Sequence, residues 1–509
     1  MLHRTLGIYR RVLLAKASVR IPCRRYTFPA ARLHPMIEGF SRTLQQPRFA
    51  VSPDDIQILS KPTQFYILLL EMIRRAQTRI FISSLYIGSN ESEFVSTLAE
   101  ALRNKPKLQI HMLFDLNRST RPGPHNTAKL LIPLVHDPSL RGILAKLIPP
   151  RFNEGWGTWH AKIYGVDDEV MISGANLNKS YFTDRQDRYI HFTNQQNLSQ
   201  YCFDFIEAVS TVSFELQPPV SSAPIGPYSF RDGGYEISWP TPELHPHEIH
   251  NKAELALSTL QATYHKSAPE PFDPTKVLMF PLIQAGQFNI RDEEHTLKLL
   301  FDHVNAISET PTAQGRPLFD LTSGYFGLYE EYQILILRSS NVDCRIVAAS
   351  PKANGFYGSR GVSGRIPEGY TLLEQRFMKA VKRAGRESSG STGSRGVQLN
   401  EWEKDGWTYH AKGIWLSPSA NSPPMLTLFG STNLNSRSAH IDTELSFLMV
   451  VPSTDTRSSA SSSSSASILR QQLADEIQGL RAHSTPWKGA HRNVRLGTKI
   501  LVGLVGGML

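Results

Sequence analysis

The sequence predicts an α/β fold built from two similar halves, each a mixed sheet flanked by helices. Two observations lead to this prediction. A short motif occurs twice, 250 residues apart, as His160-x-Lys162 and His410-x-Lys412. Ahead of each copy, segments with helical and strand periodicity follow one another in the same order. Because alternating helices and strands form helix-covered sheets, we expect two domains related by pseudo-twofold symmetry, with an active site at their interface.

The elements ahead of the two motifs match one by one. In the first half, the apolar spacing predicts a helix over residues 62–76, a strand over 79–85, a helix over 91–103 and a strand over 108–114. In the second half, it predicts a helix over residues 292–303, a strand over 318–322, a helix over 328–337 and a strand over 345–349. The repeated order indicates a duplicated unit.

Each motif is expected to lie in a strand. Alternate side chains of a strand share a face, so His160 and Lys162 would point one way while their neighbours pack into a core. His410 and Lys412 would repeat this arrangement. A lone H-x-K is more often a solvated strand edge, because so short a pattern arises often by chance. Its recurrence with the same companions is what indicates a function.

The companions of each motif are an amide and an acid. Asn176 and Asn433 lie in polar turns, and Asp187 and Glu444 follow them after eleven residues each. Two imidazoles, two ammoniums, two amides and two carboxylates are the groups that phosphodiester chemistry needs.

We expect one histidine to attack phosphorus and the other to act as general acid and base. The first assignment is His160 as nucleophile and His410 as acid and base, and the reverse stays open. The lysines and asparagines would hold the non-bridging oxygens, and each acid would hydrogen-bond an imidazole nitrogen.

These residues carry a resemblance to a known family. His160, Lys162 and Asp167 match the H-x-K-x4-D signature of the phospholipase D superfamily, whereas the second copy has Ser417 in place of the aspartate. In that superfamily the aspartate is thought to brace the motif. Residues 185–189 and 354–358, together with the basic N-terminus, resemble the eukaryotic mitochondrial phosphatidylglycerophosphate synthases. The resemblance covers most of residues 50–450.

The resemblance implies a reaction and its partners. It implies transfer of a phosphatidyl group from CDP-diacylglycerol to sn-glycerol 3-phosphate through a phosphohistidine, with release of CMP. No metal and no other cofactor is expected, because cationic side chains would neutralise the phosphate charge. It further implies a peripheral protein of the mitochondrial inner membrane, on the matrix side.

Several alternatives remain at this point. A cardiolipin-synthase-like or phosphatidylserine-synthase-like transferase, or a phospholipase that uses water, would carry the same motif. The remaining hypotheses are a nuclease and a catalytically inactive lipid-binding scaffold. The acceptor dependence of the reaction would separate the enzymes.

The charge distribution argues against a nucleic-acid partner. The chain has 55 Lys and Arg against 45 Asp and Glu, a net charge of +10. Eight of these cations precede Glu38, the first acid, which leaves +2 for the remainder. Residues 1–35 combine arginines, leucines and hydroxyls without an acid, which predicts a mitochondrial transit peptide; a basic disordered tail is the alternative. The three cysteines show neither disulfide nor zinc spacing.

We predict the following organisation. Residues 36–216 form the first domain, residues 217–275 a Pro/Ser-rich connector, and residues 276–509 the second domain. Serine-rich residues 386–395 and 453–467 are expected to be surface excursions. The apolar residues 500–509 follow several cations, so they predict either a frayed end or a short tail that seeks a membrane surface.

Four further residues are candidates for substrate binding. Arg118 and Arg121 follow the end of a predicted strand, where ligands often bind in α/β folds. Gly355 and Gly358 belong to a glycine-rich run whose backbone amides could hold a phosphate. A solvated loop and a plain flexible turn are the respective alternatives.

Overall fold

The structure is a computed structural model. It describes residues 31–122, 126–136, 143–148, 158–219, 225–232, 234–266, 273, 275–308, 315–388, 395–454 and 464–505. Residues 1–30 of the predicted transit peptide lie outside these residues. Of the remaining residues of that prediction, Ala31–Arg32 (β1) pairs with Ser453–Thr454 (β23), and α1 begins at Pro35.

The first large sheet holds the first H-x-K motif. Its strands are, in order across the sheet, β12 (Phe230–Asp232), β13 (Tyr235–Ser238), β11 (Phe214–Gln217), β6 (Ile143–Ile148), β5 (Gln109–Asp115), β4 (Arg79–Ser83), β7 (Ile163–Val166), β8 (Glu169–Ser173), β10 (Tyr189–Phe192) and β3 (Ile56–Leu59). β4, β5 and β6 run parallel, and β7, β8 and β10 follow in antiparallel order.

The second large sheet repeats this topology. Its strands are, in order, β15 (Ile290–Arg291), β14 (Val277–Ala285), β22 (Glu444–Val450), β21 (Leu426–Gly430), β20 (Lys412–Ser417), β16 (Leu318–Ser323), β17 (Asp343–Ala349), β18 (Val397–Trp402) and β24 (Ser484–Pro486). β16, β17 and β18 run parallel, and β20, β21 and β22 are antiparallel. The shared pattern confirms the predicted duplication.

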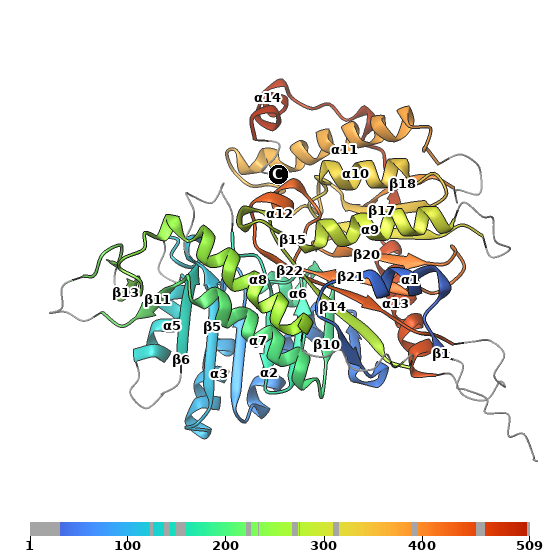
Figure 1. Cartoon of the computed structure of the whole chain (residues 1–509). Helices are drawn as coiled ribbons and strands as arrows, with labels where there is room; N and C mark the ends of the chain where they lie inside the picture. Colours follow the sequence, from blue (N-terminus) through green and yellow to red (C-terminus); the bar gives the residue numbers. More distant parts are fainter. Residues whose placement is uncertain are drawn as a thin grey trace, which may run out of the picture. The chain divides into compact units, whose positions relative to one another are not determined.

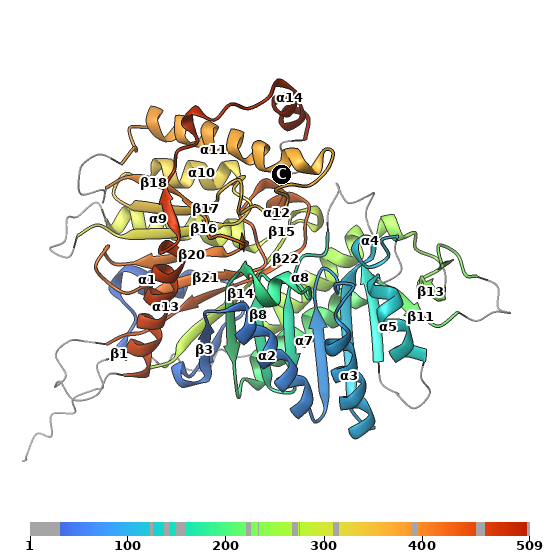
Figure 2. The same cartoon turned by 180° about the vertical axis from the view of Figure 1, so that it is seen from behind.

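Helices cover the sheets (Figures 1 and 2). With the first half lie α2 (Pro62–Arg75), α3 (Ser92–Asn104), α4 (Leu116–Ser119), α5 (Thr127–His136), α6 (Ser180–Thr183), α7 (Gln196–Ser210) and α8 (His250–Lys266). With the second half lie α1 (Pro35–Thr43), α9 (Asp292–Ile307), α10 (Glu330–Arg338), α11 (Ile366–Arg383), α12 (Ser436–His440), α13 (Ser465–Arg481) and α14 (Leu496–Val505). The short 3-10 turns are η1 (Pro53–Asp55), η2 (Pro246–Glu248), η3 (Gly286–Phe288), η4 (Ser363–Arg365) and η5 (Gly489–His491). Two short strands, β9 (Arg185–Gln186) and β19 (Thr408–Tyr409), pair with each other across the two halves.

The apolar core joins the two halves. β14 is buried on both faces, and its alternate residues enter two different cores. Val277 and Met279 join the core of the first half, whereas Leu278 and Phe280 join the core under α1, α9 and α10. Burial of apolar surface on both sides of the interface therefore fixes the halves to each other.

The predicted elements are found close to their expected positions. The predicted helices over 62–76, 91–103, 292–303 and 328–337 correspond to α2, α3, α9 and α10. The predicted strands over 79–85, 108–114, 318–322 and 345–349 correspond to β4, β5, β16 and β17. Their periodicity is local, which is why the sequence is sufficient to find them.

The domain boundaries differ from the prediction in two places. β2 (Phe49–Val51) pairs with β14 of the second sheet, although residues 36–216 were expected in the first domain. β12 and β13, from the predicted connector 217–275, extend the first sheet beside β11. Tyr235 and Ile237 are buried at alternate positions of β13, so this segment has the pattern of a half-buried strand.

The two predicted serine-rich excursions are also narrower than expected. Arg386 is buried and donates hydrogen bonds to the carbonyl oxygens of Ser340 and Val342. Residues 465–467 form the first turn of α13, capped by the Ser464 side chain. The intervening residues 389–394 and 455–463 lie outside the described residues.

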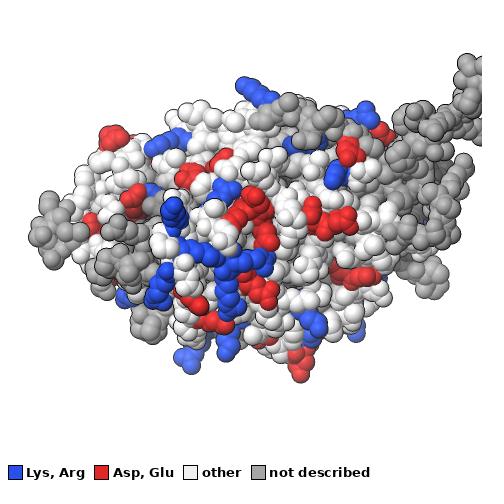
Figure 3. Space-filling view, turned by 90° about the horizontal axis from the view of Figure 1, so that it is seen from below, with Lys and Arg blue, Asp and Glu red and all other residues white. Residues whose placement is uncertain are grey.

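Two further features of the fold are the charges on its surface and the apolar character of its helices. On the face shown in Figure 3, Lys and Arg side chains gather near the centre with Asp and Glu side chains beside them. None of the described helices combines the length and the apolar character needed to cross a bilayer.

Candidate active site

Each histidine segment leaves its own sheet and pairs with the opposite half. The backbone N–H of His160 donates to Thr443 O at 3.0 Å, and the N–H of His410 donates to Gln186 O at 2.8 Å. The predicted strands around the histidines are therefore shorter than expected, because β7 begins at Ile163 and β20 at Lys412. This crossed pairing places each histidine beside the acid that follows its backbone partner.

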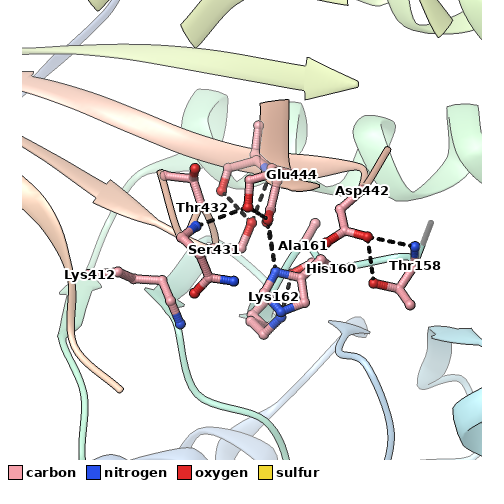
Figure 4. A network of polar contacts seen from close by, with 12 residues as sticks. Thr158, His160, Ala161, Lys162, Lys412, Ser431, Thr432, Asp442 and Glu444 are labelled. Atoms are coloured by element: carbon pink, nitrogen blue, oxygen red, sulfur yellow. Dashed lines mark hydrogen bonds and ion pairs between the residues drawn. The ribbon is translucent and has the colours of Figure 1, made fainter. Parts of the chain in front are cut away.

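Two crossed histidine–carboxylate pairs form the centre of the site. His160 Nδ1 lies 2.9 Å from Glu444 Oε2, and His410 Nδ1 lies 2.6 Å from Asp187 Oδ2. In Figure 4, Glu444 reaches the His160 ring from the opposite half. All four side chains are buried. A carboxylate on Nδ1 orients the ring and leaves Nε2 as the nitrogen for chemistry.

The two lysines are buried next to their histidines. Lys162 Nζ donates to the carbonyl oxygen of His160 at 2.5 Å, and Lys412 Nζ lies 2.9 Å from His410 Nδ1. Burial lowers the pKa of Lys162 to about 7, and it also lowers the pKa of Lys412. Two ammoniums whose charge is poorly solvated are suited to bind an anion.

The two predicted asparagines reach the same site. Asn176 Nδ2 donates to Tyr181 Oη at 3.1 Å, and Tyr181 Oη lies 3.3 Å from His410 Nε2. Among the described residues, neither Asn176 Oδ1 nor Asn433 Oδ1 has a hydrogen-bond partner, although both atoms are buried. Buried polar atoms are normally paired, so these amides have bonding capacity left for a ligand.

The two carboxylates differ electrostatically. Burial alone would raise the pKa of Glu444, but the charge and hydrogen bond of His160 lower it to about 2. Burial raises the pKa of Asp187 to about 6, although Lys412 opposes the shift. Burial lowers the pKa of His160 and, more strongly, that of His410. Glu444 is thus the stronger acid of the two, and Asp187 holds a proton up to a higher pH.

Close packing at Gly174 explains a glycine in the first amide turn. A Cβ on Gly174 would lie 2.5 Å from Asp187 Oδ1 and 2.9 Å from Lys412 Nζ. Any larger residue would push apart the acid of the first half and the lysine of the second. The glycine therefore permits the two halves to approach.

Sequence reasoning missed a second layer of crossed contacts. Asp442 Oδ1 accepts hydrogen bonds from the backbone N–H and the hydroxyl of Thr158, at 2.8 Å and 3.0 Å. Arg185 Nε donates to Thr408 Oγ1 at 2.9 Å. Both threonines stand two residues before their histidine, and Asp442 and Arg185 stand two residues before the acids. This spacing was a usable signal, because the repeat extends beyond the residues first singled out.

Asp167 lies away from the site, and Arg121 and Gly358 are exposed. Asp167 accepts hydrogen bonds from the backbone N–H groups of residues 77–79, at the far end of β7. Those contacts brace the β7–β8 turn, as the resemblance implies. Gly358 has φ +75°, and a Cβ there would have open space around it, so the backbone conformation of the turn is what favours glycine.

Two of the predicted substrate-binding residues, Arg118 and Gly355, lie closer to the active site. Arg118 is in α4, and its N–H donates to Asp115 Oδ1 while Asp115 Oδ2 accepts from the Trp159 N–H at 3.2 Å. A Cβ on Gly355 would lie 3.1 Å from Arg185 Nη2 and 3.2 Å from Tyr325 Oη. Tyr325 in turn packs its ring against His410, with the centroids 5.4 Å apart.

No group of three or more His, Cys, Asp or Glu side chains within the described ranges is arranged to hold a metal ion.

Comparisons with known proteins agree with this geometry. The family described as "Cardiolipin synthase, PLD-like domain" matches residues 69–208. A Schizosaccharomyces pombe protein named "CDP-diacylglycerol--glycerol-3-phosphate 3-phosphatidyltransferase" is 33% identical over 488 residues, covering 86% of this chain and 91% of that protein. A Homo sapiens protein with the same name followed by "mitochondrial" is 32% identical over 502 residues, covering 90% of this chain and 84% of that protein.

A solved structure shares the fold. Phosphatidylserine synthase from Haemophilus influenzae has a TM-score of 0.65 and 18% identity, and the match covers 92% of this chain and 98% of that one. The fold, the duplicated motif and the extent of the sequence matches lead to one assignment: this chain belongs to the CDP-diacylglycerol--glycerol-3-phosphate 3-phosphatidyltransferase family of the phospholipase D superfamily.

Proposed function

We propose that this protein transfers the phosphatidyl group of CDP-diacylglycerol to sn-glycerol 3-phosphate, giving phosphatidylglycerophosphate and CMP. The observation that carries the proposal is the pair of crossed histidine–carboxylate contacts, with two buried lysines and two amides around them. The names of the related proteins supply the two substrates. The groups present are those that stabilise and transfer a phosphodiester.

The first half-reaction forms a covalent intermediate. His160 Nε2 attacks the phosphatidyl phosphorus, so that a P–N bond forms while the P–O bond to CMP breaks. Glu444 keeps the proton on Nδ1 in place and stabilises the positive charge that develops on the ring. The Asp187–His410 pair gives its proton to the departing oxygen.

The second half-reaction reverses these roles. His410 removes the proton from the hydroxyl of glycerol 3-phosphate, the alcohol oxygen attacks phosphorus, and the P–N bond breaks to release His160. A phosphate is a good leaving group, whereas an alcohol is a weak nucleophile. We therefore expect the base role of His410 to matter more than its acid role.

The lysines and amides bind the phosphate oxygens. Lys162 and Lys412 are cations in a buried site, where charge interactions are stronger than in water. A side-chain amide has a donor end and an acceptor end, and a half-turn exchanges them. Asn176 and Asn433 can therefore direct a donor at the non-bridging oxygens, where negative charge increases in the transition state.

The test uses the full-length protein in detergent micelles with CDP-diacylglycerol and EDTA. CMP release is followed with and without glycerol 3-phosphate. We expect release that requires glycerol 3-phosphate, continues in EDTA and is lost in His160→Ala. Release to water alone would make the protein a phospholipase, and an active His160→Ala would contradict the mechanism.

The proposal includes peripheral binding to a membrane through α14. Leu496, Ile500 and Leu504 are 72%, 56% and 79% exposed and recur every four residues, so they form one apolar stripe on the helix. The opposite face is fixed to α11, where Thr498 Oγ1 donates to Glu368 Oε2 at 2.8 Å and Val502 packs on Leu372. Figure 1 shows α14 lying on the outer side of α11.

Charge and position favour an anionic lipid surface as the occupant of this stripe. No Asp or Glu follows Glu476 in the sequence, whereas the cations Lys488, Arg492, Arg495 and Lys499 do; Arg492 pairs with Glu401 and Arg495 with Glu368. The loop after β17 connects the site with α14. It passes the site at Gly355 and exposes Val362. It then reaches Arg365, whose Nη1 would lie 2.8 Å from a Cβ on Gly497 of α14. An apolar stripe bordered by cations is typical of helices that lie on anionic bilayers.

We further propose a mitochondrial location, on the matrix side of the inner membrane. The Homo sapiens and Gallus gallus relatives carry the word mitochondrial in their names, and residues 1–35 have the composition of a transit peptide. We expect no nucleic-acid partner, since the chain after Arg32 carries little excess charge. Microscopy of the tagged full-length protein, followed by carbonate extraction of mitochondria, tests both the organelle and the peripheral attachment.

A further inference from the structure

The two halves place opposite charges at equivalent positions. Arg185 stands two residues before Asp187, and Asp442 stands two residues before Glu444. Arg185 contacts Thr408 at 2.9 Å, and Asp442 contacts Thr158 at 2.8 Å. The pseudo-twofold site therefore has one basic end, at Arg185, and one acidic end, at Asp442.

The two charges are compensated differently. Asp442 Oδ2 pairs with Arg437 Nε at 2.9 Å, so the acidic end is neutralised within the protein. Within the described ranges, no carboxylate lies in ion-pair distance of Arg185. Its guanidinium is fixed by the hydrogen bond to Thr408, and its Cζ lies 4.5 Å from the centre of the Tyr181 ring. Asp187 acts on Arg185 only from beyond ion-pair distance, so a bound anion would further compensate this partly buried charge.

Arg185 lies next to the histidine that would activate the acceptor. One aromatic ring separates them, because the Tyr181 ring lies 5.1 Å from the His410 ring. The charge of Arg185 reaches this histidine, since it contributes to the lowered pKa of His410. Gly355 keeps the guanidinium uncovered, because a side chain there would press on Arg185 Nη2 and Tyr325 Oη.

We propose that Arg185 binds the phosphate of the acceptor and so selects a phosphorylated alcohol over a neutral one. The inference rests on the proposed transferase function. A guanidinium matches a phosphate dianion by its planar set of donors, and the stacked, hydrogen-bonded side chain is already ordered before the ligand arrives. Glycerol 3-phosphate would then extend between the two side chains, with its phosphate at Arg185 and its reacting hydroxyl at His410.

The test compares Arg185→Leu with the wild type in steady-state kinetics. We expect KM for glycerol 3-phosphate to rise about 10- to 100-fold, because charged hydrogen bonds to the phosphate are lost. KM for CDP-diacylglycerol should stay unchanged, and the CMP burst in the absence of acceptor should change much less than KM for glycerol 3-phosphate, because Arg185 acts on that step only through the pKa of His410. The preference for glycerol 3-phosphate over glycerol should fall by the same factor, and Arg185→Lys should recover part of it.

The matched control is Arg103→Leu, which removes an exposed arginine of α3 and should leave all constants unchanged. An unchanged KM for glycerol 3-phosphate in Arg185→Leu would overturn the inference, and so would an equal loss of the CMP burst, which would mean a structural role. If the wild type shows no release dependent on glycerol 3-phosphate, the proposed function itself fails. Thermal unfolding of each variant shows whether it is folded.

Discussion

His160 and His410 are each held by an acid from the opposite half, yet the two acids lie in different surroundings. Glu444 accepts from His160 and from the Ser438 hydroxyl at 2.6 Å, and its pKa falls to about 2. Asp187 is equally buried, but its pKa is raised to about 6. The duplicated fold gives both halves a histidine–carboxylate pair, and the residues around each pair give the two carboxylates different pKa values.

This difference favours His160 as the nucleophile. Glu444 has the lower pKa and stays ionised to a lower pH, so it keeps the proton on Nδ1 of His160 and leaves a lone pair on Nε2. The other pair, whose acid has a raised pKa, is the better store for the proton that moves during the reaction. The Arg185 end of the site, beside His410, is consistent with the acceptor arriving there.

The largest effect should come from the histidines themselves. We expect His160→Ala and His410→Ala each to lower turnover by on the order of 10⁴-fold or more. With CDP-diacylglycerol labelled in the phosphatidyl phosphate, His410→Ala should still acquire acid-labile label, whereas His160→Ala should not. Label trapped on His160→Ala but not on His410→Ala would reverse the two roles.

The acids should separate the two half-reactions. We expect Glu444→Gln to slow the CMP burst by about 10²- to 10⁴-fold, since the amide cannot stabilise the charged ring. Asp187→Asn should leave more of the burst and mainly slow transfer to glycerol 3-phosphate. Rapid-quench measurements of CMP and of product give the two rates separately. Equal slowing of both steps by both variants would mean that the pairs are not specialised.

Two neighbouring arginines should differ in what they support. Arg188 pairs with Glu476 at 2.8 Å and stacks on Trp415 at 3.8 Å, so it joins the first half to α13. Arg188→Leu should lower the free energy of unfolding by about 3–5 kcal/mol, because it leaves a buried carboxylate unpaired. Arg185→Leu should leave stability nearly unchanged. Urea titration measures both, and the double variant Arg188→Leu/Glu476→Leu should recover part of the loss.

The second half also differs from the first by carrying the apolar stripe of α14. Replacing Leu496, Ile500 and Leu504 with Ser should weaken binding to vesicles containing phosphatidylglycerol by about 10- to 100-fold. Turnover of a soluble short-chain CDP-diacylglycerol should be unchanged. The control Leu255→Ser alters a side chain of α8 that is 66% exposed and should bind like the wild type. Unaltered vesicle binding in the triple variant would remove α14 from the membrane contact.

The pH dependence of turnover should report the protonation of the two lysines. Lys162 must be protonated to bind phosphate oxygens, and its pKa is lowered to about 7 by burial. Its ammonium is present below that pH and is lost above it, so kcat/KM for CDP-diacylglycerol should fall about tenfold per pH unit in the alkaline range. Lys162→Arg should move this alkaline limb upward if the variant is active. A limb that moves with Lys412→Arg instead would assign it to the second half.

The sequence was sufficient for much of the site because repeats and periodicity are local. His160, Lys162, Asn176 and their partners of the second half could be found from spacing alone. Asp167 was named from the resemblance to the H-x-K-x4-D signature, and it lies at the far end of β7, because a position along a strand gives no distance to phosphorus.

By itself the sequence determined the duplication, the order of the elements and the chemical groups available for catalysis. Tertiary structure decided which groups meet: His160 with Glu444 across 284 residues, and His410 with Asp187 across 223 residues. It also decided that Arg188 pairs with an acid, whereas Arg185, only three positions away, has no acid in ion-pair distance among the described residues. The physical reason is that spacing along a chain sets local geometry, whereas partners, burial and therefore pKa depend on packing between the two halves.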